Sequence, residues 1–190
     1  MKNINEFIKK RRTIHSYSAE PIDKELIEEA IDCALYAPNH KLTFPMRFTI
    51  IPKEFRKALA NISLAVRKRK GRALTPEDEA KIIQKFENPS HILIVSQVKH
   101  TDPLILKEDY ATLAMGIQNF SLFLWEKGYG TKWSSGSIIK EDELYSLCGI
   151  NPKEESIEAL LWAGQPEKEP PPPKRPSVND MTRTLSPPNS

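Results

Sequence analysis

The 190-residue sequence contains no long hydrophobic run, and apolar stretches such as Ile92–Val95 have four or five residues. A membrane-spanning helix needs about 20 consecutive apolar residues. The sequence therefore excludes a transmembrane helix and predicts no membrane partner. The opening residues 1–6 also lack an apolar stretch, so we expect no secretory signal and a cytoplasmic protein.

Cysteine is scarce, and its two copies, Cys33 and Cys148, do not form a CxxC pair. Each lies on the expected apolar side of a helix, so we interpret both as buried structural thiols. A disulfide or a nucleophilic thiol is the alternative. So few cysteines fit a reducing cytoplasm.

Several motifs of catalysis and nucleotide binding are also missing. The seven glycines form neither GxGxxG nor a P-loop, which excludes the common nucleotide-binding loops. The four histidines lack zinc-site spacing, and there is no GxSxG motif. We therefore expect neither a metal centre nor a serine nucleophile.

The composition is otherwise ordinary for a soluble domain, with 39% hydrophobic residues, 28% charged residues and a net charge of +3. The densest charge run, Arg67–Arg72, has no interleaved aromatic residues. We interpret it as a solvated helix end. A basic nucleic-acid-binding module is the alternative, and we expect no nucleic-acid partner.

Helical and strand periodicities alternate along the chain, which predicts a mixed α and β fold around one sheet. The strongest element is a long helix over 102–128, whose apolar residues fall on one stripe: Leu106, Tyr110, Leu113, Ile117, Phe120 and Leu124. We expect this helix to be central and buried. The other expected helices cover 4–12, 24–37, 54–70, 76 onward and 140–147, and the expected strands cover 47–51, 91–98, 131–133 and 158–163.

The composition changes after Gly164, where prolines become frequent. We therefore divide the chain into a domain over 1–165 and a proline-rich arm over 166–190. The arm is expected to be extended and not helical, either as a tail or as a strap across a partner.

Three local features can carry chemistry. Arg11-Arg12-Thr13 suits a phosphate. The alternative is that these basic residues interact favourably with the dipole at a helix C-terminus. The loop Ala37–Lys41 offers amide and imidazole donors, or is a plain loop. The turn at 130–137 can present backbone N–H groups and hydroxyls to an anion, or is a polar connection.

In this order and at these distances, the features resemble the nitroreductase family of flavin enzymes over about residues 3–176. The motifs that carry the resemblance are Arg11-Arg12-Thr13, Tyr36–Lys41, Pro45–Phe48, Glu108–Ala111, Gln118-Asn119, Gly128–Gly130, Trp133–Gly136 and Ala163–Pro166. The resemblance implies an α+β fold with a mixed sheet flanked by helices. It also implies an intertwined homodimer with FMN at the interface of both chains.

The resemblance assigns FMN contacts to residues from several segments, with Tyr36 and His40 contributed by the other subunit. The implied cofactor-binding residues are Arg11, Arg12, Thr13, His15, Tyr36, His40, Trp133, Ser134, Ser135, Gly136, Lys174 and Arg175. The sequence departs from the family pattern at His15, Leu42, Phe44 and Met46. Phe44 and Met46 are expected either to form an apolar wall beside the ring or to pack in the core.

The implied activity is two-step: NAD(P)H passes hydride to the flavin and leaves, and a small-molecule oxidant such as a nitroaromatic or a quinone takes its place. No side chain acts as a nucleophile in this scheme. The sequence does not choose the oxidant, or NADH over NADPH. A flavoprotein of the same fold with another redox chemistry is the alternative.

Overall fold

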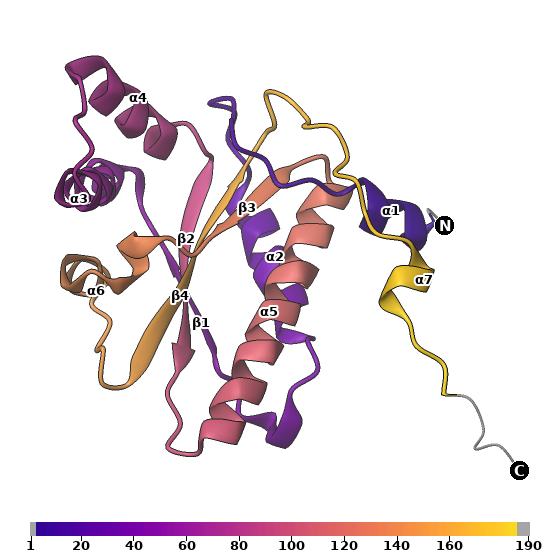
Figure 1. Cartoon of the computed structure of the whole chain (residues 1–190). Coiled ribbons are helices and arrows are strands. Elements are labelled where there is room, and N and C mark those ends of the chain that lie inside the picture. Colours follow the sequence, from indigo (N-terminus) through magenta and orange to yellow (C-terminus); the bar gives the residue numbers. More distant parts are fainter. Residues whose placement is uncertain (1–2, 186–190) are drawn as a thin grey trace, which may run out of the picture.

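Helices cover both faces of one four-stranded sheet in the computed structural model, which describes residues 3–185 (Figure 1). The strands lie in the order β1-β2-β4-β3, and neighbours are antiparallel: β1 (Met46–Ile50), β2 (His91–Val98), β4 (Glu155–Gly164) and β3 (Gly130–Ser134). Thr13 adds a parallel bridge to Thr131 beside β3. The predicted α+β architecture is confirmed.

Seven helices connect and flank these strands within the described residues: α1 (Ile4–Lys10), α2 (Lys24–Leu35), α3 (Arg56–Arg69), α4 (Pro76–Glu87), α5 (Pro103–Glu126), α6 (Asp142–Cys148) and α7 (Val178–Met181). Most bounds agree with the predicted ranges to within two residues. α1 ends two residues before the predicted end, so Arg11 and Arg12 lie outside it. None of the described helices is long and apolar enough to cross a membrane.

Two hydrophobic clusters form because successive strand residues face opposite sides of the sheet. In β2, Ile92 and Ile94 face the cluster under α3, α4 and α6, whereas Leu93 and Val95 face the cluster under α2 and α5. Every one of these four side chains is fully buried. The sheet is therefore the common floor of two layers of helices.

α5 is the long central helix that the sequence predicted. Asp102 caps its start by accepting a hydrogen bond from the Leu104 N–H at 2.8 Å. Most of the predicted stripe is buried, but Tyr110 is 44% exposed in the single chain. Gly116 lets α5 approach the sheet, since a Cβ there would lie 2.5 Å from Met46 Sδ.

The N-terminal segment crosses the sheet where two glycines face each other. Gly130 and Gly164 pair in register between β3 and β4. A Cβ on Gly130 would lie 2.2 Å from Ile14 Cγ1, and one on Gly164 would lie 2.8 Å from Tyr17 Cδ1. The paired glycines therefore make room for the segment that carries His15.

The C-terminal arm leaves the body beside this segment. Ser18 N–H donates to the Gln165 carbonyl at 3.0 Å, and Tyr17 bridges Pro166. Residues 167–176 have no helix or strand, as expected, but α7 follows, so the prediction of an arm without helix is wrong at its end. Ser177 caps α7 by accepting from the Asp180 N–H. The predicted arm continues over 186–190, outside the described residues.

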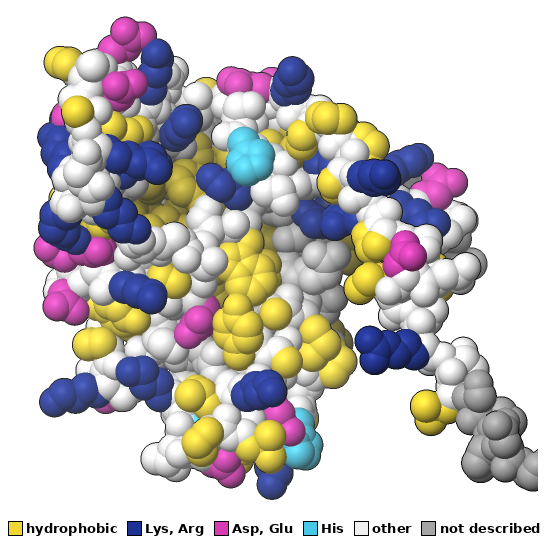
Figure 2. Space-filling view, viewed as in Figure 1, with side chains coloured by type: hydrophobic (Ala, Val, Ile, Leu, Met, Phe, Trp, Pro, Cys, Tyr) yellow, Lys and Arg dark blue, Asp and Glu magenta, His cyan; other side chains and the backbone are white. Residues whose placement is uncertain are grey.

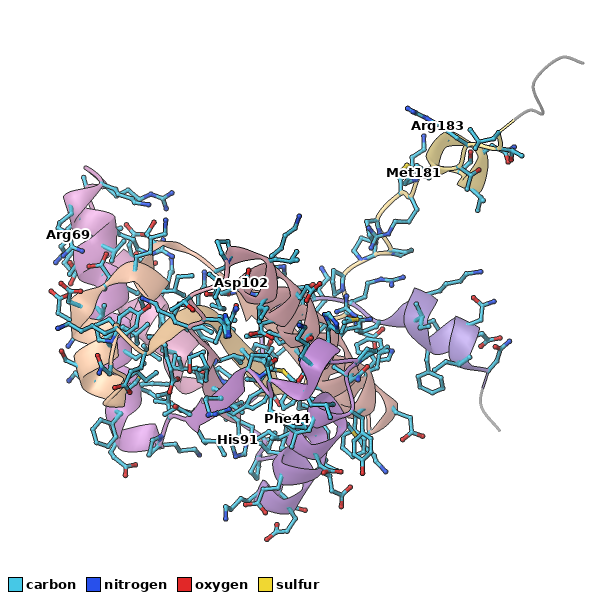
Figure 3. All side chains as sticks on the ribbon, turned by 90° about the horizontal axis from the view of Figure 1, so that it is seen from below. Phe44, Arg69, His91, Asp102, Met181 and Arg183 are labelled. Carbon is cyan, nitrogen blue, oxygen red and sulfur yellow. The ribbon has the colours of Figure 1, made fainter. Side chains whose placement is uncertain are left out.

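The two cysteines differ from their predicted burial. Cys33 and Cys148 are free thiols that are only partly buried, so they are not the fully buried core thiols that the helix pattern predicted. α1 and α7 both project from the edge of the molecule (Figure 1). Figure 3 shows Met181 and Arg183 on the arm, far from the helix layer that carries Arg69.

Candidate functional site

The run Arg11-Arg12-Thr13 follows α1, and the structure separates the roles of its two arginines. Arg12 Nη1 donates to the carbonyl oxygens of Lys9 at 2.6 Å and Arg11 at 2.8 Å. These bonds satisfy acceptors left free at the helix end. The alternative interpretation of the motif was that its basic residues stabilise the C-terminus of the helix. This interpretation holds for Arg12.

Arg11 is different because its half-buried guanidinium makes no hydrogen bond or ion pair within residues 3–185. Burial lowers the pKa of Arg11, and the positive charges of Arg12 and Arg175 lower it further. Arg175 thus brings the arm close to the N-terminal motif, with the exposed Lys174 beside it. Neighbouring guanidinium groups without an acidic partner favour an anion such as phosphate.

A cavity of about 440 Å³ lies between α3, α4 and the end of β3. We call it the basic cavity because six basic side chains line it: His15, Arg67, Lys70, Arg72, Lys85 and Lys132. Ser134 and Gly136 of the predicted turn line the same cavity. Thr13 lies one step before Ile14 on the same extended segment and is exposed.

The turn that contains Trp133–Gly136 keeps one hydrogen-bond donor unused. Ser134 Oγ accepts from Trp162 Nε1 at 3.1 Å, but the buried Trp133 Nε1 has no hydrogen-bond partner in the described chain. Buried N–H groups in folded proteins are almost always paired. Trp133 thus has a hydrogen-bond donor available for a bound molecule. Ser135 is exposed and lines none of the described cavities.

His40 lies in the loop after α2 and contacts α5 near its start. It does not line the basic cavity. Its Nδ1 is 2.6 Å from Glu108 Oε2, and its side chain is 60% exposed. Tyr36 is more exposed still, at 79%. Glu108 belongs to a quoted motif but was not predicted as a site residue, and only its pairing with His40 in space reveals it.

The loop after His40 has an unusual backbone. Lys41, Leu42 and Phe44 all have positive φ values, of 59°, 52° and 46°. Asn39 holds the loop: its Oδ1 accepts from the Phe44 N–H at 2.7 Å, and its Nδ2 donates to Thr43 Oγ1 at 2.9 Å. Strained backbone of this kind persists where surrounding contacts fix it, and it gathers at ligand sites.

Buried polar groups of α5 anchor this loop. Thr43 donates to Asp109, which is 2% exposed, and Thr112 donates to the Pro38 carbonyl at 2.9 Å. Sequence reasoning missed Asp109 and Thr112, since polar residues on an amphipathic helix are usually solvated. The polar pair inside an apolar stripe was the available signal.

A second cavity, of about 300 Å³, lies beside this loop; we call it the loop cavity. Phe44 and Met46 line it together with Asn39 and Arg47. Phe44 is 58% exposed, so it is not packed in the core, whereas Met46 is buried at 7%. Both side chains therefore line a cavity beside the loop, and Met46 also packs in the core, which was the alternative expectation.

The two groups of candidate residues lie at opposite ends of α5. His40 contacts Glu108 near the start of α5, whereas α1, which precedes Arg11, encloses a small cavity with Trp125 near its end. Seventeen residues separate Glu108 from Trp125, which corresponds to about 25 Å along a helix axis. The two groups of candidate residues therefore lie well apart within one chain.

Comparison with known proteins gives consistent matches over nearly the whole chain. The chain is 32% identical over 183 residues to "Putative NAD(P)H nitroreductase YfhC" of Bacillus subtilis (strain 168), covering 93% of this chain and 91% of the relative. A nitroreductase-like family protein from Bacillus cereus has a TM-score of 0.83 at 25% identity, with 97% of both chains covered. The FMN and NADPH-dependent nitroreductase NfnB from Sphigopyxis sp. strain HMH has a TM-score of 0.77 at 17% identity, covering 97% of this chain and 99% of that one.

These matches define the class of the protein as an α+β protein of the nitroreductase fold. A family model described as "Nitroreductase family" matches residues 8–165. The chain belongs to the nitroreductase family and is an oxidoreductase of that class. The predicted family and fold are confirmed.

Proposed function

We propose that the chain is an FMN-dependent oxidoreductase that takes hydride from NAD(P)H and reduces a small-molecule oxidant such as a nitroaromatic or a quinone. Family membership and the NAD(P)H nitroreductase relative support this activity. The FMN and NADPH-dependent relative of the same fold agrees with it. In the structure, the observation that carries it is the unpaired guanidinium of Arg11 beside Arg175.

The residues present fit FMN in two places. Arg11 and Arg175 provide planar donors for a phosphate, with Thr13 and Lys174 close by in the sequence. His15 and Ser134, which line the basic cavity, provide donors for a polar ring or a ribityl chain, and Trp133 Nε1 is a further unused donor on the opposite face of β3. The remaining predicted contacts, Arg12, Ser135 and Gly136, flank these groups, and Arg12 already caps α1.

FMN, when bound, supplies the reversible two-electron chemistry of the reaction. The chain then has three tasks: to hold the phosphate through Arg11, to orient the ring beside Trp133, and to exclude water with apolar side chains such as Phe44. Nothing in these tasks requires a nucleophile or a proton donor of unusual pKa. The oxidant is therefore selected by the shape and charge of the space beside the ring.

We also propose that two copies of the chain form a homodimer and that each cofactor site uses both. Exposed apolar side chains gather on the end of α2, on the loop before β1 and on α5: Leu35, Tyr36, Leu42, Phe44, Leu104, Tyr110 and Met115. A contiguous apolar patch on a soluble protein favours a protein partner. In the crossed arrangement, Tyr36 and His40 of one copy reach the site that Arg11 of the other copy anchors.

We propose that the chain divides into a domain over 1–165 and an arm over 166–190. The arm is proposed to lie across the partner chain and so to stabilise the dimer. The prolines of its described part favour an extended chain over 166–176, and Arg175 lies near Arg11, so a bound phosphate would hold the arm at the cofactor site. We place the protein in the cytoplasm because both cysteines are free thiols.

The visible spectrum of the purified protein tests this proposal most directly. We expect a yellow protein with flavin absorbance that bleaches on anaerobic addition of NADH or NADPH and returns when an oxidant is added. Light scattering of the same sample should give the mass of a dimer. A colourless protein that takes up no added FMN would overturn the proposal.

A further inference from the structure

The loop that joins α2 to β1 has a backbone conformation that its own side chains do not explain. Lys41, Leu42 and Phe44 have positive φ values although none of them is a glycine, and residues with a Cβ keep this conformation only where other contacts impose it. Leu42 and Phe44 are 68% and 58% exposed, so their own burial does not fix the backbone of the single chain. Figure 2 shows hydrophobic side chains on the surface at the lower end of the molecule, where the loop and the start of α5 lie (Figure 1). The contacts that hold the loop are therefore polar.

A chain of hydrogen bonds runs in one direction through the loop and into α5. Asn39 Nδ2 donates to Thr43 Oγ1 at 2.9 Å, and the Thr43 hydroxyl donates to Asp109 Oδ1. The other end of the same amide, Asn39 Oδ1, accepts from the Phe44 N–H at 2.7 Å. One amide thus closes the loop between residues five positions apart, and a carboxylate of α5 is the last acceptor of the chain.

Asp109 sets the direction of these hydrogen bonds. A carboxylate only accepts hydrogen bonds, whereas a hydroxyl both donates and accepts. The single hydroxyl hydrogen of Thr43 therefore goes to Asp109, and Thr43 offers only lone pairs to Asn39. The Asn39 amide must then turn its NH₂ group toward Thr43 and its oxygen toward the Phe44 N–H. Without the carboxylate, the hydroxyl and the amide are free to reverse, and the bond to Phe44 is lost.

The burial of the Asp109 carboxylate is costly. Asp109 is 2% exposed and is the only buried acidic side chain among the described residues. Its side chain forms no ion pair within residues 3–185, and its one hydrogen bond there comes from Thr43. Buried charges are normally paired, because an isolated charge inside a protein is strongly disfavoured. Leu113, one turn further along the same helix, is fully buried, so an apolar residue suits this depth. What the carboxylate provides here is its contact with the loop.

Two further side chains of α5 hold the same loop. Glu108 Oε2 lies 2.6 Å from His40 Nδ1, and Thr112 donates to the Pro38 carbonyl at 2.9 Å. In the sequence, His40 lies between Pro38 and Thr43, the two points at which the loop is bonded to Thr112 and to Asp109. The position of the His40 imidazole therefore follows from the conformation of the loop.

We propose that Asp109 is a positioning residue for the FMN of the partner chain. Through Thr43 and Asn39 it holds the loop that carries His40, and it does not itself contact the cofactor. This inference rests on the proposed function, because it uses the crossed dimer stated there. Loss of Asp109 therefore weakens the FMN site that Arg11 of the other copy anchors. The site anchored by Arg11 of its own chain is left intact.

Two mixed dimers with the same two substitutions in different arrangements test this proposal. In the first, one chain carries Arg11→Ala and the other carries Asp109→Asn. In the second, one chain carries both substitutions and the other is unmodified. Asp109→Asn keeps the shape of the side chain, but an amide both donates and accepts, so the direction of the hydrogen bonds is no longer fixed. Titration with FMN, followed by quenching of its fluorescence, measures the affinity of each site.

We expect the first mixed dimer to bind one FMN with the affinity of the unmodified protein, because both lesions fall on one site. The second should have no intact site, because Arg11→Ala weakens one site and Asp109→Asn weakens the other by about tenfold, the factor that 1.4 kcal/mol produces. Any other pattern overturns the inference. An intact site only in the second would show that Asp109 supports its own chain, and an intact site in both would show that Asp109 has no effect on FMN.

Asp142→Asn is the matched control for Asp109→Asn. Asp142 is exposed and lies on α6, on the other side of the sheet, and the change in charge is the same. In place of Asp109→Asn, it should leave one intact site in both mixed dimers. Loss of the intact site in the second mixed dimer with Asp142→Asn would show that the lost charge alone weakens FMN binding, which overturns the assignment.

Substitutions of Thr43 test the same chain of hydrogen bonds if Asp109→Asn does not fold. Thr43 is only half-buried; Thr43→Val removes the hydroxyl, and Thr43→Ser keeps it. We expect Thr43→Val to give the pattern of Asp109→Asn in both mixed dimers, and Thr43→Ser to leave one intact site in both. The Phe44 amide hydrogen should also exchange faster in Thr43→Val without FMN, since its acceptor is released. Equal behaviour of the two variants, or unchanged exchange, overturns the inference.

Failure of the proposed function gives different results. A protein that holds no FMN rejects the flavin oxidoreductase itself. A mixed dimer of Arg11→Ala and His40→Ala chains with two equally weakened sites rejects the crossed arrangement. An intact site in that mixed dimer, together with the wrong pattern for Asp109→Asn, rejects only the role of Asp109.

Discussion

Two runs of basic residues span the C-terminal ends of helices in this chain, Lys9–Arg12 at the end of α1 and Arg67–Arg72 at the end of α3. In each run some cations have structural partners: Lys10 pairs with Glu6 and Arg12 caps α1, whereas Lys68 and Arg69 pair with acids. Arg11 in the first run and Arg67 in the second have none within the described residues. Of these two unpaired cations, Arg11 lies beside Arg175, and Arg67 lines the basic cavity.

The difference between the runs lies in what surrounds the unpaired charges. Arg11 lies beside Arg175 of the arm that is proposed to strap the dimer. Arg67 lines a cavity with an aromatic floor inside one chain. The first run therefore suits a phosphate held between two copies, and Arg67 of the second shares its cavity with the proposed FMN contacts His15 and Ser134.

The largest expected effect comes from releasing α3, which carries the second run, from the sheet. Arg56 is 2% exposed and donates to the carbonyl oxygens of Glu87 at 3.0 Å and Ser90 at 2.5 Å, as well as to Pro89. Arg56→Met leaves these buried acceptors unpaired, which should lower the free energy of unfolding by about 3 kcal/mol or more. Urea denaturation measures it.

Lys57→Met is the matched control for Arg56→Met. Lys57 is the next residue in the sequence, and its own side chain is exposed. We expect a change below about 0.5 kcal/mol for it. Equal stability of the two variants would show that Arg56 does not hold α3 in place.

The next largest effect concerns FMN binding and compares Arg11 with Arg12 in the first run. Arg11→Ala should raise the dissociation constant of FMN roughly 10- to 150-fold, because a charge-assisted hydrogen bond contributes about 1.5–3 kcal/mol. Arg12→Ala should raise it by less than about tenfold, since the Arg12 guanidinium is occupied at the end of α1. Quenching of FMN fluorescence on binding measures both. Equal losses would contradict the division of roles.

A mixed dimer tests whether the two ends of α5 serve different cofactors. In a heterodimer of one Arg11→Ala chain and one His40→Ala chain, the crossed arrangement places both lesions in one site and none in the other. We expect one FMN per dimer with the affinity of the unmodified protein. Two equally weakened sites would show that Arg11 and His40 of one chain act on the same FMN.

His40→Ala alone has a smaller expected effect than Arg11→Ala. The variant should fold and dimerise, because the His40 side chain is 60% exposed and pairs only with Glu108. If His40 acts on the flavin, reduction by NAD(P)H slows or FMN binds less tightly. A lower melting temperature with unchanged FMN affinity and reduction rate would assign His40 to loop support alone.

The regular elements could be predicted because each carries its own signal. β2 is short, apolar and rich in branched residues, and the structure gives it the predicted bounds. α5 shows a stripe over more than five turns. α7 was missed because a four-residue helix with a Ser177–Asp180 capping box after prolines has too few residues to show a period.

The division of the basic runs could not be predicted, because the deciding partners are remote in sequence. Arg69 and Glu141 are 72 residues apart, and the charge of Arg67 in α3 acts on Lys132 in β3. The run Arg67–Arg72 was interpreted as a solvated helix end, which holds for Lys68 and Arg69 but not for the cavity side. Packing, not local pattern, decides which cation stays free.

The smallest expected effects belong to the paired cations, and they complete the contrast. Lys10 and Glu6 form an exposed pair at 3.0 Å, and Lys68 and Glu79 form a partly exposed pair at 2.6 Å. Exposed pairs contribute about 0–1 kcal/mol, so Lys10→Ala and Lys68→Ala should shift the free energy of unfolding by no more than that. Urea denaturation at low and high salt measures the shift, which salt should reduce further. Neither change should alter the affinity for FMN by more than about twofold, because each lysine is paired with an acid and neither lines the basic cavity. If Lys10→Ala weakened FMN binding as strongly as Arg11→Ala, the overall positive field at the end of α1 would attract the phosphate, and the presence of an acidic partner would no longer separate binding cations from structural ones.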